Sequence, residues 1–305
     1  MTSVSISKNE YKCCTLCPRR CRADRTISSG YCGMGAVPMA AKACLHKWEE
    51  PCIAYKNGAG TVFFTGCSLH CVYCQNNVIS SEGFGAQVPA DRLSDIFLRL
   101  QDDGADNIEL VTPTHFIPDI IYALEKVKNR LSVPVVYNTG GYELKETIRR
   151  LEGLVDVYLP DIKYYSSEIS EKYSNAPDYF EYASEAVLEM IRQTGDLCYN
   201  DEGGLLRGTV IRHLVIPGCR HDSIRIMEWI AENTDSEQVL ISIMNQYTPF
   251  DFIPDIFTDL KRHVTKMEYN SVVRKATELG LNGFTQDSSS AKEEYVPDFD
   301  LSGIT

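Results

Sequence analysis

Short apolar runs alternate with amphipathic segments along most of this chain, and that alternation restricts its fold more than any other feature. The expected strands are 61–65, 107–112, 133–138, 155–160, 209–216 and 238–244. The expected helices are 89–103, 117–129, 143–151, 181–194, 223–233 and 271–279. Strands that are apolar on both faces and separated by helices indicate a parallel sheet with right-handed crossovers. Six such units are too few for a closed eight-unit barrel, so we predict an α/β fold of the partial (β/α)6 TIM-like barrel type.

The first expected strand runs directly into a loop that contains Cys67, Cys71 and Cys74. At the carboxyl end of a parallel strand, such a loop lies where α/β folds place their chemistry. Reduced thiolates this close together favour a soft metal centre. A structural zinc ion takes four ligands, whereas three cysteines on a four-iron cluster leave one iron open to a small molecule. The alternative is a group of packed cysteines without a metal.

A second group of cysteines precedes the barrel, in the segment 11–52, which shows little periodicity. Its spacing, Cys-x2-Cys-Pro-x2-Cys followed by a cysteine between glycines, predicts a second metal site. Zinc and an auxiliary iron–sulfur cluster both remain open, and so does a patch of reduced cysteines without metal. The predicted ligands are Cys14, Cys17, Cys21 and Cys32. The cysteines left over, any of which could replace a ligand, are Cys13, Cys44 and Cys52.

These patterns divide the chain into three expected parts. Residues 1–55 form a cysteine-rich metal-binding module, residues 56–280 form the barrel, and residues 281–305 form a polar C-terminal tail. The tail is either laid across the barrel or partly disordered.

The cysteine loop resembles that of the radical S-adenosylmethionine (SAM) enzymes, whose pattern is Cys-x3-Cys-x-aromatic-Cys, with Tyr73 in the aromatic place. The resemblance implies a six-unit partial barrel and a [4Fe-4S] cluster on Cys67, Cys71 and Cys74, with SAM bound to the open iron. It also implies the reaction. An electron from the reduced cluster breaks the bond between sulfur and the 5′ carbon of SAM, and the 5′-deoxyadenosyl radical abstracts hydrogen from a substrate.

The ends of the third and fourth expected strands resemble one branch of this superfamily, the branch related to pyruvate formate-lyase activating enzyme. The motifs are Asn138-Thr139-Gly140-Gly141-Tyr142 and Leu159-Pro160-Asp161-Ile162-Lys163. The resemblance implies that Lys163 meets the SAM carboxylate. It also implies that Asn138 and Asp161 contact SAM or a nearby cation. An ordinary surface ion pair is the alternative for Lys163 and Asp161.

The fifth and sixth strand ends extend this resemblance. The run Ile211-Arg212-His213-Leu214-Val215-Ile216-Pro217-Gly218 resembles the fifth strand of the branch. The resemblance implies that this strand, with Arg212, borders the adenine and ribose of SAM. Gln246 and Tyr247 would close the sixth side.

The second strand end departs from the commonest family pattern. Many members carry Gly-Gly-Glu there, which binds the SAM amino group, whereas this chain has Thr112-Pro113-Thr114-His115. The hydroxyls of Thr112 and Thr114 can accept hydrogen bonds from an ammonium group. His115 is a candidate proton donor or substrate partner, and a structural role for it stays open.

Five tyrosines lie between the fourth and fifth expected strands, and they either line a substrate channel or pack in the core or at its rim. They are Tyr164, Tyr165, Tyr173, Tyr179 and Tyr182.

The charge of the chain argues against a nucleic-acid surface, because the net charge is −12. One basic run, from Arg19 to Arg25, leaves RNA modification as a minor alternative. Binding of RNA that weakens steeply with salt would support this alternative. No apolar run reaches the roughly 18 residues of a membrane span, and Met1–Ser7 lacks the apolar stretch of a signal peptide. We therefore expect a cytoplasmic protein.

Two classes of function follow. The first is a radical SAM enzyme that acts on an unidentified substrate: a glycine of a partner protein, a peptide, a nucleotide-like molecule or a small metabolite. Such an enzyme needs a low-potential electron donor of the flavodoxin or ferredoxin type. The second is a non-catalytic iron–sulfur or zinc protein, an electron carrier or an assembly factor. A carrier does best with a fully ligated cluster, so three cysteines favour the enzyme.

Overall fold

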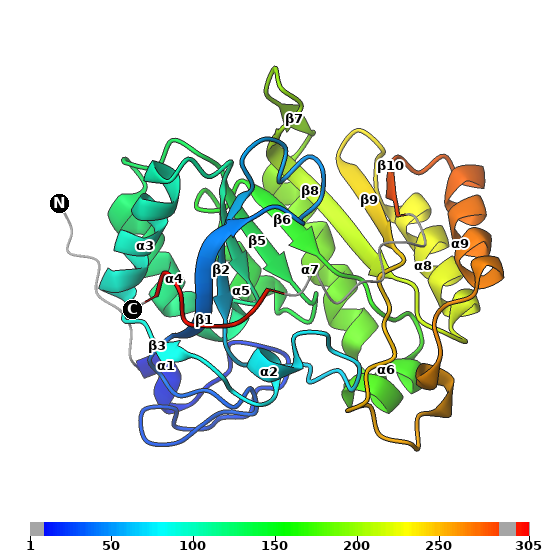
Figure 1. Ribbon diagram of the computed structural model, residues 1–305, viewed down its shortest axis with the longest axis horizontal. Helices are drawn as coiled ribbons and strands as arrows, with labels where there is room; N and C mark the ends of the chain where they lie inside the picture. Colours follow the sequence, from blue (N-terminus) through cyan, green and yellow to red (C-terminus); the bar gives the residue numbers. More distant parts are fainter. Residues whose placement is uncertain (1–8, 287–296, 305) are drawn as a thin grey trace.

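One open sheet runs through the computed structural model, which describes residues 9–286 and 297–304 (Figure 1). The strands are β1 (Met39–His46), β2 (Ala59–Phe64), β3 (Ala86–Gln87), β4 (Ile108–Val111), β5 (Val135–Thr139), β6 (Val157–Pro160), β7 (Cys198–Tyr199), β8 (Leu205–Leu214), β9 (Val239–Met244) and β10 (Gly283–Thr285). They lie in the order β10-β9-β8-β6-β5-β4-β2-β1-β3, and β7 pairs with β8. All neighbours from β2 to β10 are parallel. The predicted open partial barrel is confirmed.

In the described ranges a helix lies at each of the six predicted helical segments, and three short helices, at residues 9–12, 77–80 and 167–174, were not predicted. The helices are α1 (Asn9–Lys12), α2 (Asn77–Ser80), α3 (Ala90–Asp102), α4 (Ile117–Val127), α5 (Lys145–Arg149), α6 (Ser167–Ser174), α7 (Tyr179–Thr194), α8 (Arg220–Asn233) and α9 (Lys266–Glu278). In Figure 1, α3 and α4 lie together at one end of the sheet, and α8 and α9 lie together at the other.

The amphipathic face predicted for α3 packs in the main core. Leu93, Ile96, Phe97 and Leu100 are all buried there. The same core contains Leu110 of β4 and residues of α4. Burying such side chains stabilises the fold by roughly 1.5–3 kcal/mol each. The helical spacing of these apolar residues determines which face of α3 packs against the sheet.

Four strands lie where the sequence pattern predicted none: β1, the two-residue strands β3 and β7, and β10. β1 falls in the predicted cysteine-rich module and pairs antiparallel with β2 over its whole length. β10 falls in the predicted tail and pairs in parallel with β9. Residues 39–46 therefore belong to the barrel sheet. The boundary predicted near residue 55 stays a prediction.

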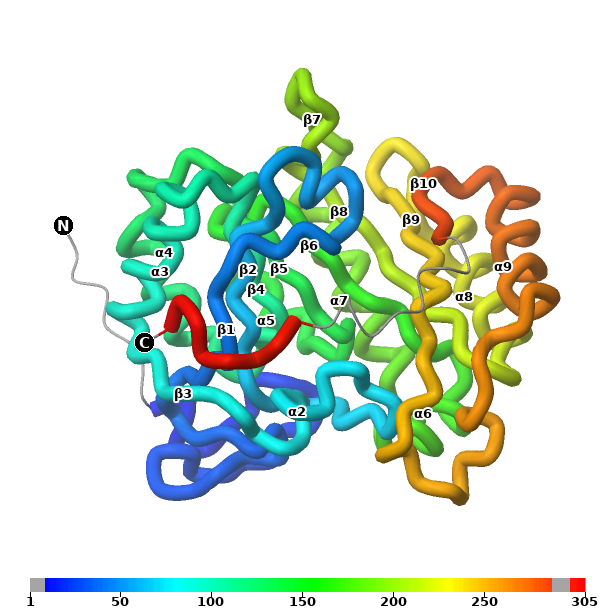
Figure 2. The backbone as a smooth tube through the Cα atoms, in the orientation of Figure 1, coloured from blue at the N-terminus to red at the C-terminus, as the bar shows by residue number. Residues whose placement is uncertain are grey.

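The end of the chain lies along β1. The N–H of Leu301 donates to the Ala41 carbonyl at 3.0 Å, and the N–H of Ala43 donates to the Ser302 carbonyl at 2.9 Å. The ring of Phe299 meets that of Phe63. Figure 2 shows this red segment crossing β1. The described end of the predicted tail thus lies across the barrel, and residues 287–296 are outside the described residues.

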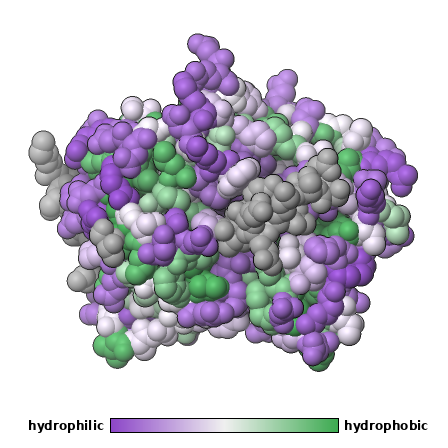
Figure 3. Space-filling model, in the orientation of Figure 1, coloured by the Kyte–Doolittle hydropathy of each residue, from purple (hydrophilic) through white to green (hydrophobic). Residues whose placement is uncertain are grey.

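Within the described ranges, no helix combines the length and the apolarity that crossing a bilayer requires. Hydrophilic and hydrophobic residues are interspersed over the face shown in Figure 3.

Candidate functional site

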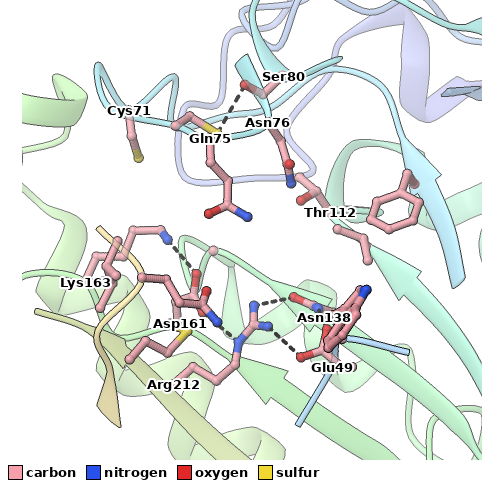
Figure 4. Close-up of a pocket in the computed structure, with 18 of the residues that line it drawn as sticks. Glu49, Cys71, Gln75, Asn76, Ser80, Thr112, Asn138, Asp161, Lys163 and Arg212 are labelled. Atoms are coloured by element: carbon pink, nitrogen blue, oxygen red, sulfur yellow. Dashed lines mark hydrogen bonds and ion pairs between the residues drawn. The ribbon is translucent and has the colours of Figure 1, made fainter. Parts of the chain in front are cut away.

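A cavity of about 480 Å³ opens among the carboxyl ends of the parallel strands. This volume is in the range of small-molecule sites. The cysteine loop forms one side of the cavity, and the opposite side is charged (Figure 4). The predicted site residues that line it are Cys67, Cys71, Tyr73, Cys74, Thr112, Asn138, Asp161, Lys163, Arg212 and Gln246.

Each sulfur of the cysteine loop accepts one hydrogen bond. The donors are the N–H of Leu69 to Cys67 at 3.4 Å, the Ser174 hydroxyl to Cys71 at 3.0 Å, and the Ser80 hydroxyl to Cys74 at 3.4 Å. Burial, followed by the charges of the other two thiolates, raises the pKa of Cys67 to about 12. Three thiolates are therefore stable together only with a positive centre among them.

No group of three or more His, Cys, Asp or Glu side chains in the described ranges is arranged to hold a metal ion. This does not conflict with a cubane, in which each cysteine binds its own iron. The loop offers three thiols, and thiols are the ligands that iron–sulfur clusters use, so the donor set fits such a cluster.

The charged floor of the cavity consists of Glu49, Asn138, Asp161, Lys163 and Arg212 (Figure 4). The Arg212 guanidinium donates to Asn138 Oδ1 at 2.6 Å, to Asp161 Oδ1 at 3.0 Å and to Glu49 Oε1 at 3.2 Å. Asp161 also pairs with the Lys163 ammonium at 2.5 Å. Both Asn138 and Asp161 contact the Arg212 guanidinium in this structure, and their predicted contact with SAM or a nearby cation stays a prediction.

The pair of Asp161 and Lys163 is not an ordinary surface pair, because its side chains are only 10% and 16% exposed. Burial alone would raise the pKa of Asp161. The charges of Arg212 and Lys163 outweigh that effect and hold the pKa below its ordinary value. Both partners therefore stay charged inside the cavity.

Sequence reasoning missed several acidic residues around the charged floor. Glu109 is fully buried on β4 and accepts from Asn138 Nδ2 at 2.7 Å and from the Thr61 hydroxyl at 2.6 Å. The sequence did carry a signal for Glu109, because a carboxylate inside the apolar run Ile108–Val111 is unusual. Glu49 and Glu50 both line the cavity, although their segment reads as a plain connection. Burial, followed by the charge of Glu49, raises the pKa of Glu50 to about 7.

The cysteine loop also contributes two amides that sequence reasoning missed. Gln75 and Asn76 line the cavity, and both side chains point into it (Figure 4). Asn76 Oδ1 is buried and has no hydrogen-bond partner among the described residues. An acceptor in this state is available to a ligand.

Tyr73 and the predicted group of tyrosines form a buried aromatic cluster behind the cysteine loop. The hydroxyl of Tyr73 lies 2.7 Å from that of Tyr164, and its ring meets the rings of Tyr173 and Tyr247. Tyr164, Tyr173 and Tyr179 are buried. Tyr165 and Tyr182 are half-buried, and none of these five lines the cavity. Tyr164, Tyr173 and Tyr179 therefore pack in the core, and Tyr165 and Tyr182 pack at its rim.

Two residues of the second strand end do not face the cavity. The Thr114 hydroxyl donates to Glu143 Oε1 at 2.5 Å. His115 is buried, its Nε2–H donates to the Thr65 carbonyl at 2.8 Å, and burial lowers its pKa to about 3. Within the described ranges Thr112 alone of this trio lines the cavity, and its φ is +57°.

Glu143 is a fully buried carboxyl that lies directly after the β5 end. Its Oε1 accepts from the hydroxyls of Thr114 and Thr139 at 2.5 Å each and from Tyr137 at 3.3 Å. Its Oε2 has no hydrogen-bond partner in the described part of the chain. Burial raises the pKa of Glu143 to about 7, although the three hydroxyls oppose that rise.

The elevated pKa of Glu143 should make stability depend on pH. The folded-state pKa is above the unfolded value of about 4.3, so the stabilisation is complete below that value and is lost as pH rises through about 7. We expect the free energy of unfolding to fall by roughly 3 kcal/mol over this interval. Glu143→Gln should remove this dependence in chemical denaturation series at several pH values. Glu146→Gln, at an exposed neighbouring site, is the control and should retain it. Equal slopes in wild type and Glu143→Gln would contradict the assignment.

Comparisons with known proteins agree with this geometry. Residues 61–230 match the family model of the radical SAM superfamily. An uncharacterized protein of Methanocaldococcus jannaschii, MJ0674, is 28% identical over 291 residues, which cover 92% of this chain and 78% of that protein. A solved radical SAM methyltransferase from Sphaerobacter thermophilus is similar in fold, with a TM-score of 0.50 and 14% identity. That likeness covers 75% of this chain and 66% of the methyltransferase, so the chain spans just under two thirds of its length.

Proposed function

Because this chain belongs to the radical SAM superfamily, whose general reaction is the cleavage of SAM, we propose that Cys67, Cys71 and Cys74 hold its [4Fe-4S] cluster. The observation that carries the proposal is that all three cysteines border the same cavity as Lys163 and Asp161. When bound, the cluster would supply the electron that cleaves SAM to methionine and a 5′-deoxyadenosyl radical, which takes a hydrogen atom from the substrate.

The charged floor would bind and orient SAM. Burial alone would lower the pKa of Lys163, but the charge of Asp161, with those of the Cys71 and Cys74 thiolates, raises it above its ordinary value. A carboxylate between the cysteine loop and Lys163 would meet this cation where water is scarce, which strengthens the attraction. Gly140 leaves room for this approach, because a Cβ there would stand 3.5 Å from Lys163 Cε and 3.1 Å from Leu69 Cδ1.

The missing Gly-Gly-Glu changes how the SAM ammonium would be held. Thr112 lines the cavity at that strand end, and Asn76 Oδ1 offers an unpaired acceptor from the cysteine loop. These two groups, in place of a carboxylate, are our candidates for the ammonium contact. Arg212 would contact the adenosine part of SAM, and Gln246 would close the opposite side.

The substrate and the reductant are proposed only by class. The resemblance implies a glycine of a partner protein as the substrate, and a peptide, a nucleotide-like molecule or a small metabolite are the alternatives. The reductant is a low-potential carrier of the flavodoxin or ferredoxin type.

Anaerobic reconstitution tests the proposal. Protein loaded with iron and sulfide should convert SAM to 5′-deoxyadenosine and methionine in equal amounts when dithionite is added, as measured by liquid chromatography. A heated sample is the control. Folded, cluster-loaded protein that forms no 5′-deoxyadenosine would reject the enzyme and favour an electron carrier.

A further inference from the structure

Arg25 is a buried cation among the N-terminal loops. Its side chain is 2% exposed, and its guanidinium donates to the carbonyls of Met34 at 3.0 Å, Gly35 at 2.6 Å and His115 at 2.6 Å. No carboxylate lies within 4.0 Å of it in the described part of the chain. The carbonyls satisfy its hydrogen bonds, and the ring of Tyr11, whose hydroxyl donates to the buried Asp119 carboxylate, packs against the guanidinium. No carboxylate of the described residues pairs with Arg25 directly, and a buried charge without a direct counter-charge is costly.

The nearest groups that can become anionic are thiols. Arg25 Nη1 lies 3.6 Å from Cys14 Sγ. The sulfurs of Cys21 and Cys32 border the space left by Gly30, since a Cβ on this glycine would stand 3.5 Å from each and 3.3 Å from Arg25 Cδ. The φ of Gly30 is not positive, so the backbone does not require glycine there. Glycine keeps the space between the thiols open.

The backbone gathers these cysteines. The N–H of Cys14 donates to the Ala23 carbonyl at 3.1 Å, and the Cys14 carbonyl accepts from the N–H of Arg22 at 2.9 Å. This pairing folds the chain back, so that Cys17 and Cys21 lie on a closed loop. Arg20 and Arg22, on either side of Cys21, have φ values of +39° and +54°. Such conformations cost energy in residues other than glycine.

We propose that Cys14, Cys17, Cys21 and Cys32 bind a metal centre of net negative charge, and that Arg25 is its buried counter-cation. Four thiolates on a four-iron cluster, or on one zinc ion, carry an excess of negative charge. In the described ranges no group of such side chains converges on a single ion, so a cluster, in which each cysteine binds its own iron, agrees with this arrangement, whereas a zinc ion would need the four sulfurs to move closer together. Both kinds of centre would be bound through the four cysteine thiolates. The centre accounts for the buried charge, for the open space at Gly30 and for the spacing of the cysteines.

The proposed centre would also stabilise the position of the cysteine loop at the cavity. The Arg19 guanidinium donates to the carbonyls of Ser68 and Ser174, both at 2.8 Å. A Cβ on Gly66 would stand only 2.7 Å from the Cys32 carbonyl, so the N-terminal loops press against the start of the cysteine loop. Figure 2 shows these dark-blue loops at the same edge of the molecule as α2.

Thiol alkylation of the wild-type protein tests the site without a mutation. Cys13 and Cys21 are both exposed in the structure, and Cys13 is outside the proposed ligand set. In anaerobically purified protein, mass spectrometry should find Cys13 labelled by iodoacetamide and Cys21 protected. A chelator should then make Cys21 reactive. Cys21 that is labelled as fast as Cys13, before and after chelation, would overturn the proposal.

Metal analysis identifies the centre. In a Cys67→Ala/Cys71→Ala/Cys74→Ala background we expect either about one zinc or about four irons with equal sulfide per chain. Either result supports the centre and decides its type, and absence of both rejects it. Cys14→Ser should lose this metal, whereas Cys13→Ser should keep it.

Charge variants test Arg25. In chelator competition, Arg25→Gln should weaken metal affinity roughly 10–100-fold, as changes next to metal ligands do. Arg25→Lys keeps the charge and should remain near wild type. Equal affinity of folded Arg25→Gln and wild type would refute the counter-cation role. If Arg25→Gln does not fold, Arg25→Lys decides: metal retention supports the role, and loss as complete as in Cys14→Ser refutes it.

Discussion

Cys71→Ala should reduce 5′-deoxyadenosine formation to background and abolish the iron–sulfur absorbance of the reconstituted protein. Cys71 is buried at the cavity, and its sulfur accepts a hydrogen bond from the Ser174 hydroxyl. Because Cys71 is one of the three proposed cluster ligands, its loss should lower activity by more than the roughly 100-fold that is typical of changes to residues next to metal ligands. Ser174→Ala removes this hydrogen bond and the one between the Ser174 and Tyr164 hydroxyls but keeps the Cys71 sulfur, so it should cost less, about tenfold.

Cys219→Ala is the matched control for Cys71→Ala. Cys219 is half-buried and packs at the edge of the same hydrophobic cluster, but it does not line the cavity. The control should retain the iron, the sulfide and the SAM cleavage of wild type. Full activity in Cys71→Ala, or equal losses in the two variants, would mean that the three cysteines are not the cluster ligands.

The barrel strands were predictable because each carries its own local signal. The runs around Val62, Leu110 and Val136 are apolar on both faces and are followed by turns. β1 was missed because Met39–His46 is rich in alanine and interrupted by Lys42, so it has no apolar run. β10 was missed because it has only three residues, Gly283–Thr285. Its strand character comes from pairing with β9, which no local pattern can reveal.

The site was predictable only where spacing or motif marked it. Cys67, Cys71 and Cys74 are close in the sequence, and the segment from Asp161 to Lys163 stands directly at a strand end. Glu49 gives no such signal, because it reaches Arg212 across 163 positions of the chain. The place of Thr114 in the sequence gave a misleading signal for the opposite reason. It follows its strand as a ligand would, but a short 3-10 turn, Thr114–Phe116, directs its hydroxyl to Glu143.

Arg212→Met should destabilise the fold by about 3–5 kcal/mol, since it removes one partner of a buried ion-pair network. The Arg212 side chain is 14% exposed and pairs with Glu49 and Asp161. In the described ranges Glu49 has no other cation within 4.0 Å, whereas Asp161 keeps Lys163. The uncompensated charge would therefore be on Glu49. Urea denaturation measures the change, and Arg274→Met, whose partner Glu278 is exposed, should cost less than about 1 kcal/mol.

The double variant Arg212→Met/Glu49→Gln tests whether the loss of stability comes from the uncompensated charge of Glu49. Neutralising Glu49 removes the orphaned charge, so the double variant should be more stable than Arg212→Met by about 1–3 kcal/mol. The same variants should separate folding from ligand binding. SAM affinity, measured on folded protein by equilibrium dialysis, should stay low in the double variant, because the guanidinium is still absent. If Glu49→Gln gave no rescue of stability, the charge of Arg212 would be balanced chiefly by Asp161. The charged floor would then consist of the Arg212–Asp161 pair with Lys163 beside it, and the Glu49 carboxylate would be free to contact a ligand.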